Sequence, residues 1–252
     1  MVKLVEEKSA SNSEQFDFRS QLADLFKNSP LSPDDIMFNL GMYVRSSLLV
    51  KFLVMNDLYE RIKNIPGSLL EFGVWWGQNL VLMENLRAIH EPFNKQRVIV
   101  GFDTFTGYEN FSEKDKQSKV YQDKSYKTLA DYKSYLAQLL EAHEGSNAFG
   151  HIRGNHKLIA GDVTKTAPKY FDDHPETIVA LAYFDIGIYK PTKAALEAIK
   201  PHLVSGSVIL LDQLTWQGGA GEAIAFKEVF SNVSFRIEKC QIYPSKAIVT
   251  IK

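Results

Sequence analysis

The chain has 252 residues, 45% of them hydrophobic, and its 29 basic and 30 acidic side chains give a formal net charge of −1. This size suffices for one substantial core, and the balanced charge offers no basic surface of the kind that nucleic-acid binding requires. The single cysteine excludes an internal disulfide, no Cys/His spacing indicates zinc, and no apolar segment has the length of a signal peptide or a membrane span. We therefore expect a cytoplasmic protein that binds neither nucleic acid nor membrane.

The first 65 residues are predicted to form a polar tail and a helical cap. After the polar N-terminus, apolar side chains recur at helical spacing over residues 16–26. Ser32 followed by Pro33 is a typical helix start, with a capping serine and a proline at the first helical position. The charges of the apolar-rich stretch 42–65 leave a broad apolar face, so we interpret this stretch as a helix that covers the following domain.

Residues 66–252 are predicted to form one α/β domain. Five short apolar runs are typical of buried parallel strands, and each carries an acidic residue at or near its end. These runs cover residues 68–73, 97–103, 156–162, 178–185 and 207–212. Helical segments at 79–90 and 192–201 follow two of them, and residues 235–251 supply two more strands. The pattern predicts a doubly wound, Rossmann-like fold with a mostly parallel, seven-stranded sheet.

A long polar insertion, at about residues 104–150, follows the second predicted strand. Its central part shows helical periodicity over residues 129–143. Connections of this length in compact domains usually carry structure or function. We interpret the insertion as a lid over the ligand site, with an exposed, decorative segment as the alternative.

The carboxyl ends of parallel strands are where open α/β sheets bind ligands. Glu71, Gly73 and Gly77 follow the first strand with the spacing acid-x-Gly-x-x-x-Gly. The glycines allow a tight turn and close approach of a ligand, although the same spacing suits a turn that binds nothing. The Gly-x-Gly-x-x-Gly pattern of dinucleotide sites is absent, and Glu71 would repel a pyrophosphate but attract an ammonium or sulfonium group. The sign of this charge favours S-adenosylmethionine over NAD.

Acidic residues also follow the second and third strands. The carboxylate of Asp103 suits two hydrogen bonds from ribose hydroxyls, a role shared by NAD and S-adenosylmethionine sites, or it caps a turn. Gly161 and Asp162 suit a contact with adenine, where the carboxylate faces the exocyclic amine. They suit an N-cap for the following turn equally well.

Taken in order, these motifs resemble the macrocin O-methyltransferase family, S-adenosylmethionine-dependent enzymes that methylate hydroxyls on deoxysugars of natural products. The matching phrases are Pro66-Gly67 with 71–77, Gly101-Phe-Asp-Thr-Phe-Thr-Gly107, 183–192, 201–212 and, more weakly, 219–230. The resemblance implies a class I methyltransferase fold and an O-methyl transfer to a sugar or glycosylated small molecule. It also implies a cofactor contact at Phe105 and a homodimer, whereas an N-methyltransferase is possible because a fold does not fix the acceptor atom.

The resemblance further implies a divalent cation, usually magnesium, between carboxylates at the ends of the fourth and fifth strands. Asp185 and Asp212 occupy matching positions, and Asp185 is also the candidate base for the acceptor hydroxyl. Gly187 and Gln213 stand where the family usually has further aspartates. Because the carbonyl oxygen of Gln213 is a legitimate ligand for a hard cation, we expect a weakened metal site of Asp185, Asp212 and Gln213, with metal-free catalysis as the alternative.

Two other functions stay open from the sequence. A nucleotide-binding Rossmann oxidoreductase would share the acid at Asp103, but the missing glycine motif counts against it. A non-catalytic partner protein that kept a methyltransferase fold would account for Gly187 and Gln213. Transfer of a labelled methyl group to a sugar-bearing acceptor distinguishes these alternatives from the enzyme.

Overall fold

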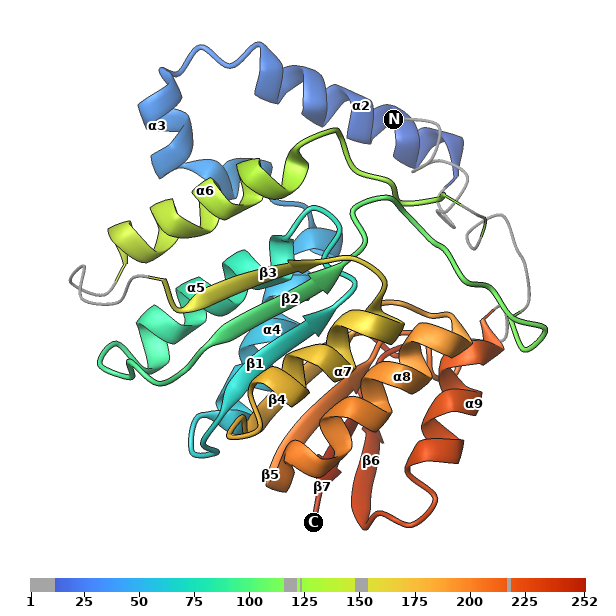
Figure 1. Cartoon of the computed structure of the whole chain (residues 1–252). Coiled ribbons are helices and arrows are strands. Elements are labelled where there is room, and N and C mark those ends of the chain that lie inside the picture. The colour runs from blue at the N-terminus through green and yellow to red at the C-terminus, as the bar shows by residue number, and fades with distance from the viewer. Residues whose placement is uncertain (1–11, 116–121, 123, 148–153, 217–218) are drawn as a thin grey trace. The chain divides into compact units, whose positions relative to one another are not determined.

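The computed structural model describes residues 12–115, 122, 124–147, 154–216 and 219–252. The chain divides into two compact units, Met1–Phe52 and Leu53–Lys252 (Figure 1). The tail 1–11 and the parts of the predicted insertion at 116–121, 123 and 148–150 lie outside the described residues. Within the described residues, no helix combines the length and apolar character needed to cross a membrane.

The first unit is helical, as the sequence predicts. It contains α2 (Ser13–Lys27), α3 (Pro33–Phe38), the 3-10 helix η1 (Leu40–Tyr43) and the first turns of α4 (Ser46–Ile62). Asn12 begins α2 in a capping box, because its side chain accepts the N–H of Gln15 at 2.8 Å and the Gln15 side chain accepts the N–H of Asn12 at 3.1 Å. Ser32 caps α3 by accepting the N–H of Asp35 at 3.1 Å, so the predicted helix start is confirmed.

The second unit is built on a seven-stranded sheet with the order β3-β2-β1-β4-β5-β7-β6. The strands are β1 (Ser68–Phe72), β2 (Ile99–Asp103), β3 (His156–Ala160), β4 (Val179–Phe184), β5 (Leu203–Leu211), β6 (Phe235–Lys239) and β7 (Ala247–Ile251). Strands β1 to β5 are parallel, and β7 lies antiparallel between β5 and β6. This confirms the predicted class I methyltransferase architecture. The direction of strand succession reverses between β1 and β4, which is where such sheets bind ligands.

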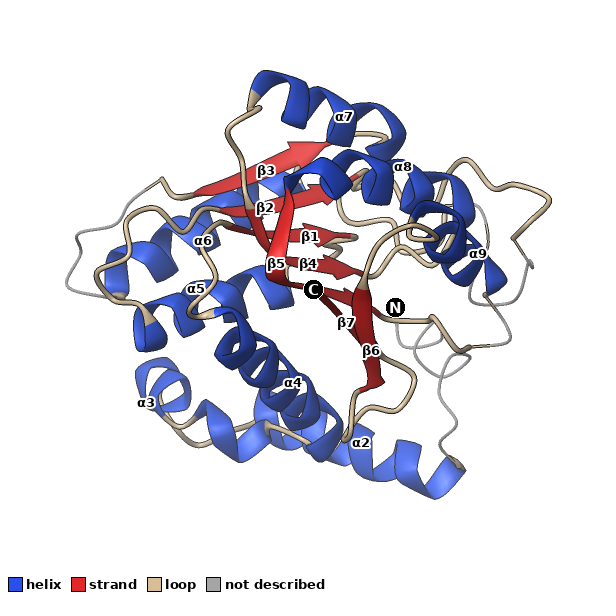
Figure 2. Ribbon diagram, turned by 90° about the horizontal axis from the view of Figure 1, so that it is seen from below, coloured by secondary structure: helices blue, strands red, loops and turns tan. Residues whose placement is uncertain are grey.

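Helices cover both faces of this sheet (Figure 2). The helices of the second unit, besides the end of α4, are α5 (Gln78–His90), α6 (Tyr132–Ser146), α7 (Val163–Asp173), α8 (Tyr189–Ile199) with the short η3 (Lys200–His202), and α9 (Ala220–Val229). Helices α7, α8 and α9 lie on one face, and α4, α5 and α6 on the other. Helix α7 was not predicted from the sequence, and it contains Pro168 in its interior.

Alternating strand residues pack into two cores, one on each face of the sheet. On the α7–α9 face, the ring of Phe72 stacks against those of Phe102 at 4.8 Å and Phe184 at 4.7 Å between centroids. On the other face, Leu69 packs with residues of α4, α5 and α6. Since neighbouring strand residues point to opposite faces, Glu71 lies on the same face as Leu69. Its carboxylate therefore enters the unit from the side that α5 and the insertion helix α6 cover.

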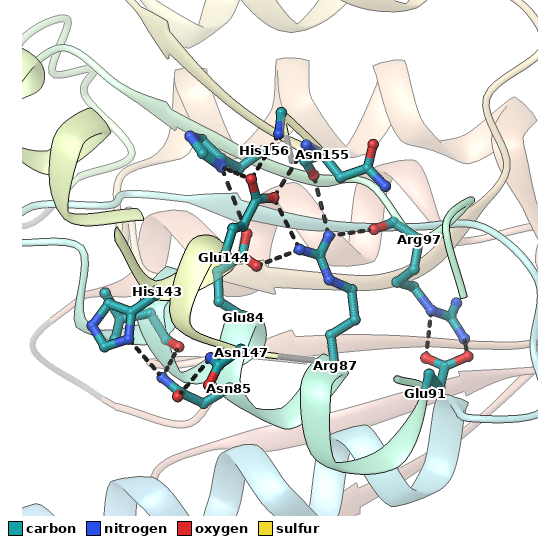
Figure 3. A network of polar contacts seen from close by, with 12 residues as sticks. Glu84, Asn85, Arg87, Glu91, Arg97, His143, Glu144, Asn147, Asn155 and His156 are labelled. Atoms are coloured by element: carbon teal, nitrogen blue, oxygen red, sulfur yellow. Dashed lines mark hydrogen bonds and ion pairs between the residues drawn. The ribbon is translucent and has the colours of Figure 1, made fainter. Parts of the chain in front are cut away.

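The insertion helix α6 is fastened to α5 by a buried ionic network (Figure 3). Arg87 of α5 donates to Glu144 of α6 at 2.9 Å and also pairs with Glu84, one turn earlier on α5. Glu144 accepts two backbone N–H groups of the segment before β3, at 2.7 and 3.1 Å, and lies 3.2 Å from Nδ1 of His156. Arg87 is the cation that compensates both buried carboxylates, so it fixes the C-terminal end of the insertion.

Candidate active site

Acidic residues from three strands meet at the point where the strand order reverses. Glu71 lies in β1, Asp103 ends β2, and Asp185 follows β4 directly. The backbone N–H of Asp185 donates to the carbonyl of Phe72 at 2.9 Å, which continues the pairing of β1 and β4 past the end of β4. The structure thus brings together, at one edge of the sheet, three of the residues that the sequence predicted there.

Glu71 is a buried carboxylate with one unsatisfied oxygen. It is 1% exposed, and its Oε1 accepts a hydrogen bond from Nδ2 of Asn79 at 2.7 Å. Its Oε2 is buried without a hydrogen-bond partner among the described residues. Burial raises the pKa of Glu71 well above its ordinary value, and repulsion by Asp185 and Asp103 raises it further. An unpaired buried charge is costly, and a cationic group of a ligand is the partner that would remove this cost.

Asp103 is held by two backbone N–H groups. Oδ2 accepts the N–H of Trp75 at 2.8 Å, and Oδ1 accepts that of Phe105 at 2.6 Å. Both donors have a left-handed backbone, with φ of 48° at Trp75 and 57° at Phe105, a conformation that costs non-glycine residues about 1 kcal/mol or more. Burial raises the pKa of Asp103, against these N–H groups, which lower it. Each oxygen keeps a second lone pair, so the carboxylate can still accept hydrogen bonds from two ribose hydroxyls.

The two glycines after β1 are required by close packing of the backbone. Gly73 has φ of 95°, and a Cβ added to it would overlap the backbone carbonyl of Asp185. Gly77 has φ of 78°, precedes the first residue of α5, and would overlap the side chain of Leu136 of the insertion helix α6. Gly73 therefore lets β1 and β4 close on each other beside Glu71, whereas Gly77 makes room for the insertion. Their predicted contacts with a cofactor stay predictions.

The turn after β3 connects the site to the insertion. Gly161 donates its backbone N–H to the carbonyl of Asp103 at 2.9 Å and has φ of 131°. Asp162 caps α7 by accepting the N–H of Thr164 at 2.9 Å, and its second oxygen accepts Nδ2 of Asn110 at 2.9 Å. The N-cap interpretation of Asp162 is confirmed, and its contact with adenine stays a prediction. Through Asn110, the insertion is joined to the edge of the sheet that carries the acids.

The predicted metal ligands lie together, but nitrogen donors face their oxygens. Nε2 of Gln213 donates to Asp212 at 2.6 Å and to Asp185 at 3.1 Å. The ammonium of Lys246, itself 4% exposed, pairs with Asp212 and donates to the hydroxyl of Tyr183 at 2.8 Å. A divalent cation needs oxygen lone pairs directed at it, and an ammonium in contact with the same carboxylate repels it. The residues present therefore do not fit the predicted magnesium ion.

A third acid, Glu222, fixes the backbone next to these residues. Glu222 of α9 is fully buried, and its Oε1 accepts the backbone N–H of Gln213 at 2.9 Å. Burial raises the pKa of Glu222 to about 8. A protonated carboxyl at this place adds no charge to the cluster while it fixes the backbone that carries the Gln213 amide.

A different group of potential metal ligands lies at the opposite edge of the sheet. Single ligand atoms of Glu84, Glu144 and His156 lie within 4.8 Å of one another, the one such group of His, Cys, Asp or Glu among the described residues. The guanidinium of Arg87 contacts both carboxylates (Figure 3). We interpret these residues as part of the network that attaches α6 to α5, because Arg87 already compensates their charge.

Three residues of the site were not found from the sequence. Asn79 and Glu222 touch the predicted residues Glu71 and Gln213, but the sequence marked a role for neither. Asn79 begins a predicted helical segment, and Glu222 lies in the weakly matching phrase 219–230. Lys246 stands 34 positions after Asp212 in the sequence. Only the pairing register of β5 with β7 brings these two together, and a single sequence does not specify that register.

Comparisons with known proteins identify relatives of this chain. The model of the macrocin O-methyltransferase (TylF) family matches residues 53–239. A structure of CalS11, described as a calicheamicin methyltransferase, is 35% identical with a TM-score of 0.90 and covers 96% of this chain and 94% of that chain. A second, apo structure of CalS11, described as a TDP-rhamnose 3'-O-methyltransferase of calicheamicin biosynthesis, is 34% identical with a TM-score of 0.83 and covers 98% of each chain.

More distant structures share the fold alone. The O-methyltransferase NovP is 16% identical with a TM-score of 0.62 and covers 81% of this chain and 80% of that chain. No curated protein matches the chain.

Proposed function

The chain belongs to the macrocin O-methyltransferase family, and we propose that it moves the methyl group of S-adenosylmethionine to a hydroxyl of a nucleotide-linked deoxysugar. The observation that carries the proposal is the pair of Glu71 and Asp103. One has a buried oxygen that lacks a partner, and the other is held rigidly by two N–H groups. This arrangement suits a ligand with a cationic end and a ribose.

The donor-binding roles follow from the charges and hydrogen bonds at the edge of the sheet. Glu71 binds the ammonium group of the donor, and Asp103 accepts hydrogen bonds from the ribose diol. Phe105 and the turn of Gly161 and Asp162 contact the adenine. The insertion, joined to this turn through Asn110, acts as the lid that excludes water from the site.

Bound S-adenosylmethionine supplies an electrophilic methyl group, which leaves the sulfur as a bond to the acceptor oxygen forms. Asp185 accepts the proton that the acceptor hydroxyl loses. Gln213 orients the Asp185 carboxylate by its hydrogen bond at 3.1 Å. Alignment of the acceptor oxygen with the methyl carbon and the sulfur accounts for several kcal/mol of rate enhancement, about 7 or more in favourable systems. Because the residues at Asp212 and Gln213 do not fit magnesium, no step of this proposal uses a divalent cation.

The acceptor class rests on the described activity of the CalS11 relative, TDP-rhamnose 3'-O-methylation, at 34% identity over almost the whole length of both chains. The sequence motifs alone leave a finished glycoside equally open, so both acceptor classes belong in the assay. The predicted dimer and cytoplasmic location stay predictions, and light scattering after gel filtration tests the dimer.

The test is transfer of a tritiated methyl group from S-adenosylmethionine to TDP-linked deoxysugars and to glycosides. Binding of S-adenosylhomocysteine is measured in parallel by calorimetry, with Asp103→Asn as the site variant. We expect binding by the wild-type chain, at least tenfold weaker binding by the variant, and transfer to at least one TDP-sugar. Binding without transfer to any acceptor would favour the non-catalytic alternative. Binding of NAD in place of S-adenosylhomocysteine would favour the oxidoreductase.

A further inference from the structure

The pairing of β5 with β7 places Lys246 next to Asp212. Strands β5 and β7 are antiparallel, with Leu211 opposite Ala247, so the next step of the same register sets Asp212 opposite Lys246. Residues opposite each other in an antiparallel pair point to the same face of the sheet. The backbone alone therefore places the lysine and the aspartate on one face at the end of β5.

The side chains make the contact that this register predicts. The ammonium of Lys246 pairs with Asp212, donates to the Tyr183 hydroxyl at 2.8 Å, and lies 4.7 Å from the centre of the Tyr243 ring. The lysine is 4% exposed. An ammonium buried to this degree needs an anionic partner, and Asp212 supplies it. The pair is thus a built part of the site, unlike a flexible surface ion pair.

Gln213 connects this ion pair to Asp185 by hydrogen bonds. Its amide nitrogen donates to both carboxylates, at 2.6 Å to Asp212 and 3.1 Å to Asp185. If the amide were turned so that its oxygen faced them, both hydrogen bonds would be lost and the ammonium of Lys246 would remain in place. Either orientation leaves Asp212 paired with a cation that belongs to the chain.

We propose that Lys246 is a built-in cation that takes the place of a divalent metal at Asp212, so that methyl transfer by this chain needs no metal. The proposal rests on the proposed function. Lys246 is a positioning residue: it neutralises Asp212, Asp212 holds the Gln213 amide, and the amide orients Asp185. One fixed positive charge beside two carboxylates replaces the two charges of a metal ion, and it does not depend on the metal content of the surroundings.

The first test requires no variant and no acceptor. Mn²⁺, a probe for divalent-cation sites, is titrated into the wild-type chain and followed by electron paramagnetic resonance. We expect no binding at or below about 1 mM. The double variant Lys246→Met with Gln213→Asp removes the ammonium and adds a third carboxylate, and we expect it to bind Mn²⁺ at least tenfold more tightly than the wild type. Asp212→Asn in that background should abolish the gain.

The second test uses methyl transfer to the acceptor found above. Wild-type activity should change less than twofold between excess EDTA and millimolar Mg²⁺. Lys246→Met should lower kcat at least tenfold and leave the affinity for S-adenosylhomocysteine within about twofold, a split that general destabilisation would not produce. Lys239→Met is the matched control, because Lys239 is exposed on the neighbouring strand β6, and its kcat should not change.

The outcomes separate this proposal from the proposed function. Wild-type Mn²⁺ binding that Asp212→Asn abolishes, or loss of activity in EDTA, overturns the role of Lys246 and leaves the methyltransferase intact. An unchanged kcat in Lys246→Met also overturns it. Failure to bind S-adenosylhomocysteine overturns the proposed function instead, while the Mn²⁺ titrations are still interpretable.

Discussion

Replacement of Glu71 by glutamine should stabilise the protein without ligand and weaken the binding of the methyl donor. Burial raises the pKa of Glu71 in the folded chain, so the folded state binds a proton more tightly than the unfolded state does. Stability from this group is therefore fully present below the unfolded pKa of about 4.3 and is lost as the pH rises towards the folded pKa, by about 1.4 kcal/mol per pH unit. Glutamine has nearly the same shape and does not titrate.

The contribution of Glu71 to stability is measured as the difference in the free energy of unfolding between the wild type and Glu71→Gln. Other buried acids, such as Glu222, contribute equally to both proteins and cancel in this difference. Urea unfolding of the ligand-free proteins between pH 5 and pH 8 measures this difference. We expect the variant to gain stability over the wild type as the pH rises, and the gain to level off once Glu71 is ionised in the folded wild type.

Ligand binding should change in the opposite direction. Loss of one partner of a buried charge pair costs about 2 kcal/mol or more, so we expect S-adenosylhomocysteine to bind Glu71→Gln at least about 30-fold more weakly. Wild-type affinity should rise with pH as Glu71 loses its proton, and the variant should lack this rise. Glu84→Gln is the matched control, since burial raises the pKa of Glu84 to about 8 at the other edge of the sheet. Equal affinity in wild type and Glu71→Gln would refute the assignment of Glu71 to the donor.

Two further substitutions test how the site is built. Gly73→Ala should lower the free energy of unfolding by about 1–3 kcal/mol, because the residue has a left-handed φ and the added Cβ would overlap a neighbouring backbone carbonyl. The control Gly145→Ala should be neutral or stabilising in the same urea titration, because its Cβ would meet no atom within 4 Å. Arg87→Met leaves the buried carboxylate of Glu144 without its cationic partner and should cost about 3–5 kcal/mol. Hydrogen exchange in α6 should accelerate in Arg87→Met more than in β4; uniform acceleration would contradict the attachment role of the network.

The sequence predicted those parts of the fold that depend on local pattern. Buried parallel strands are short apolar runs, and their carboxyl ends share one edge, so the positions of Glu71, Asp103 and Asp185 followed from the runs themselves. The capping serine Ser32 was likewise predicted from its neighbours alone. These predictions needed no knowledge of how distant segments pair.

What the sequence did not predict depends on contacts between distant segments. Lys246 meets Asp212 through strand register, and Gly77 proved to face Leu136 of the insertion, which no local spacing indicates. The misfit between these residues and the predicted magnesium ion has the same origin. A glutamine carbonyl is an acceptable ligand in isolation, but Lys246, which directly precedes β7 and decides the charge of the site, is not part of the motif.

The way the acids at this edge are neutralised suggests why a lysine suits the reaction. Asp103 is satisfied by backbone N–H groups and Asp212 by Lys246, while one oxygen of Glu71 lacks a partner among the described residues. A divalent ion in place of Lys246 would make the same edge one unit more positive and so less attractive to a positively charged sulfonium donor. At a separation of about 8 Å and an effective dielectric constant of about 20, one unit of charge changes that attraction by about 2 kcal/mol. The donor loses its sulfonium charge on methyl transfer, so a site that keeps its negative charge binds the substrate form of the cofactor more strongly than the product form, and product release becomes easier.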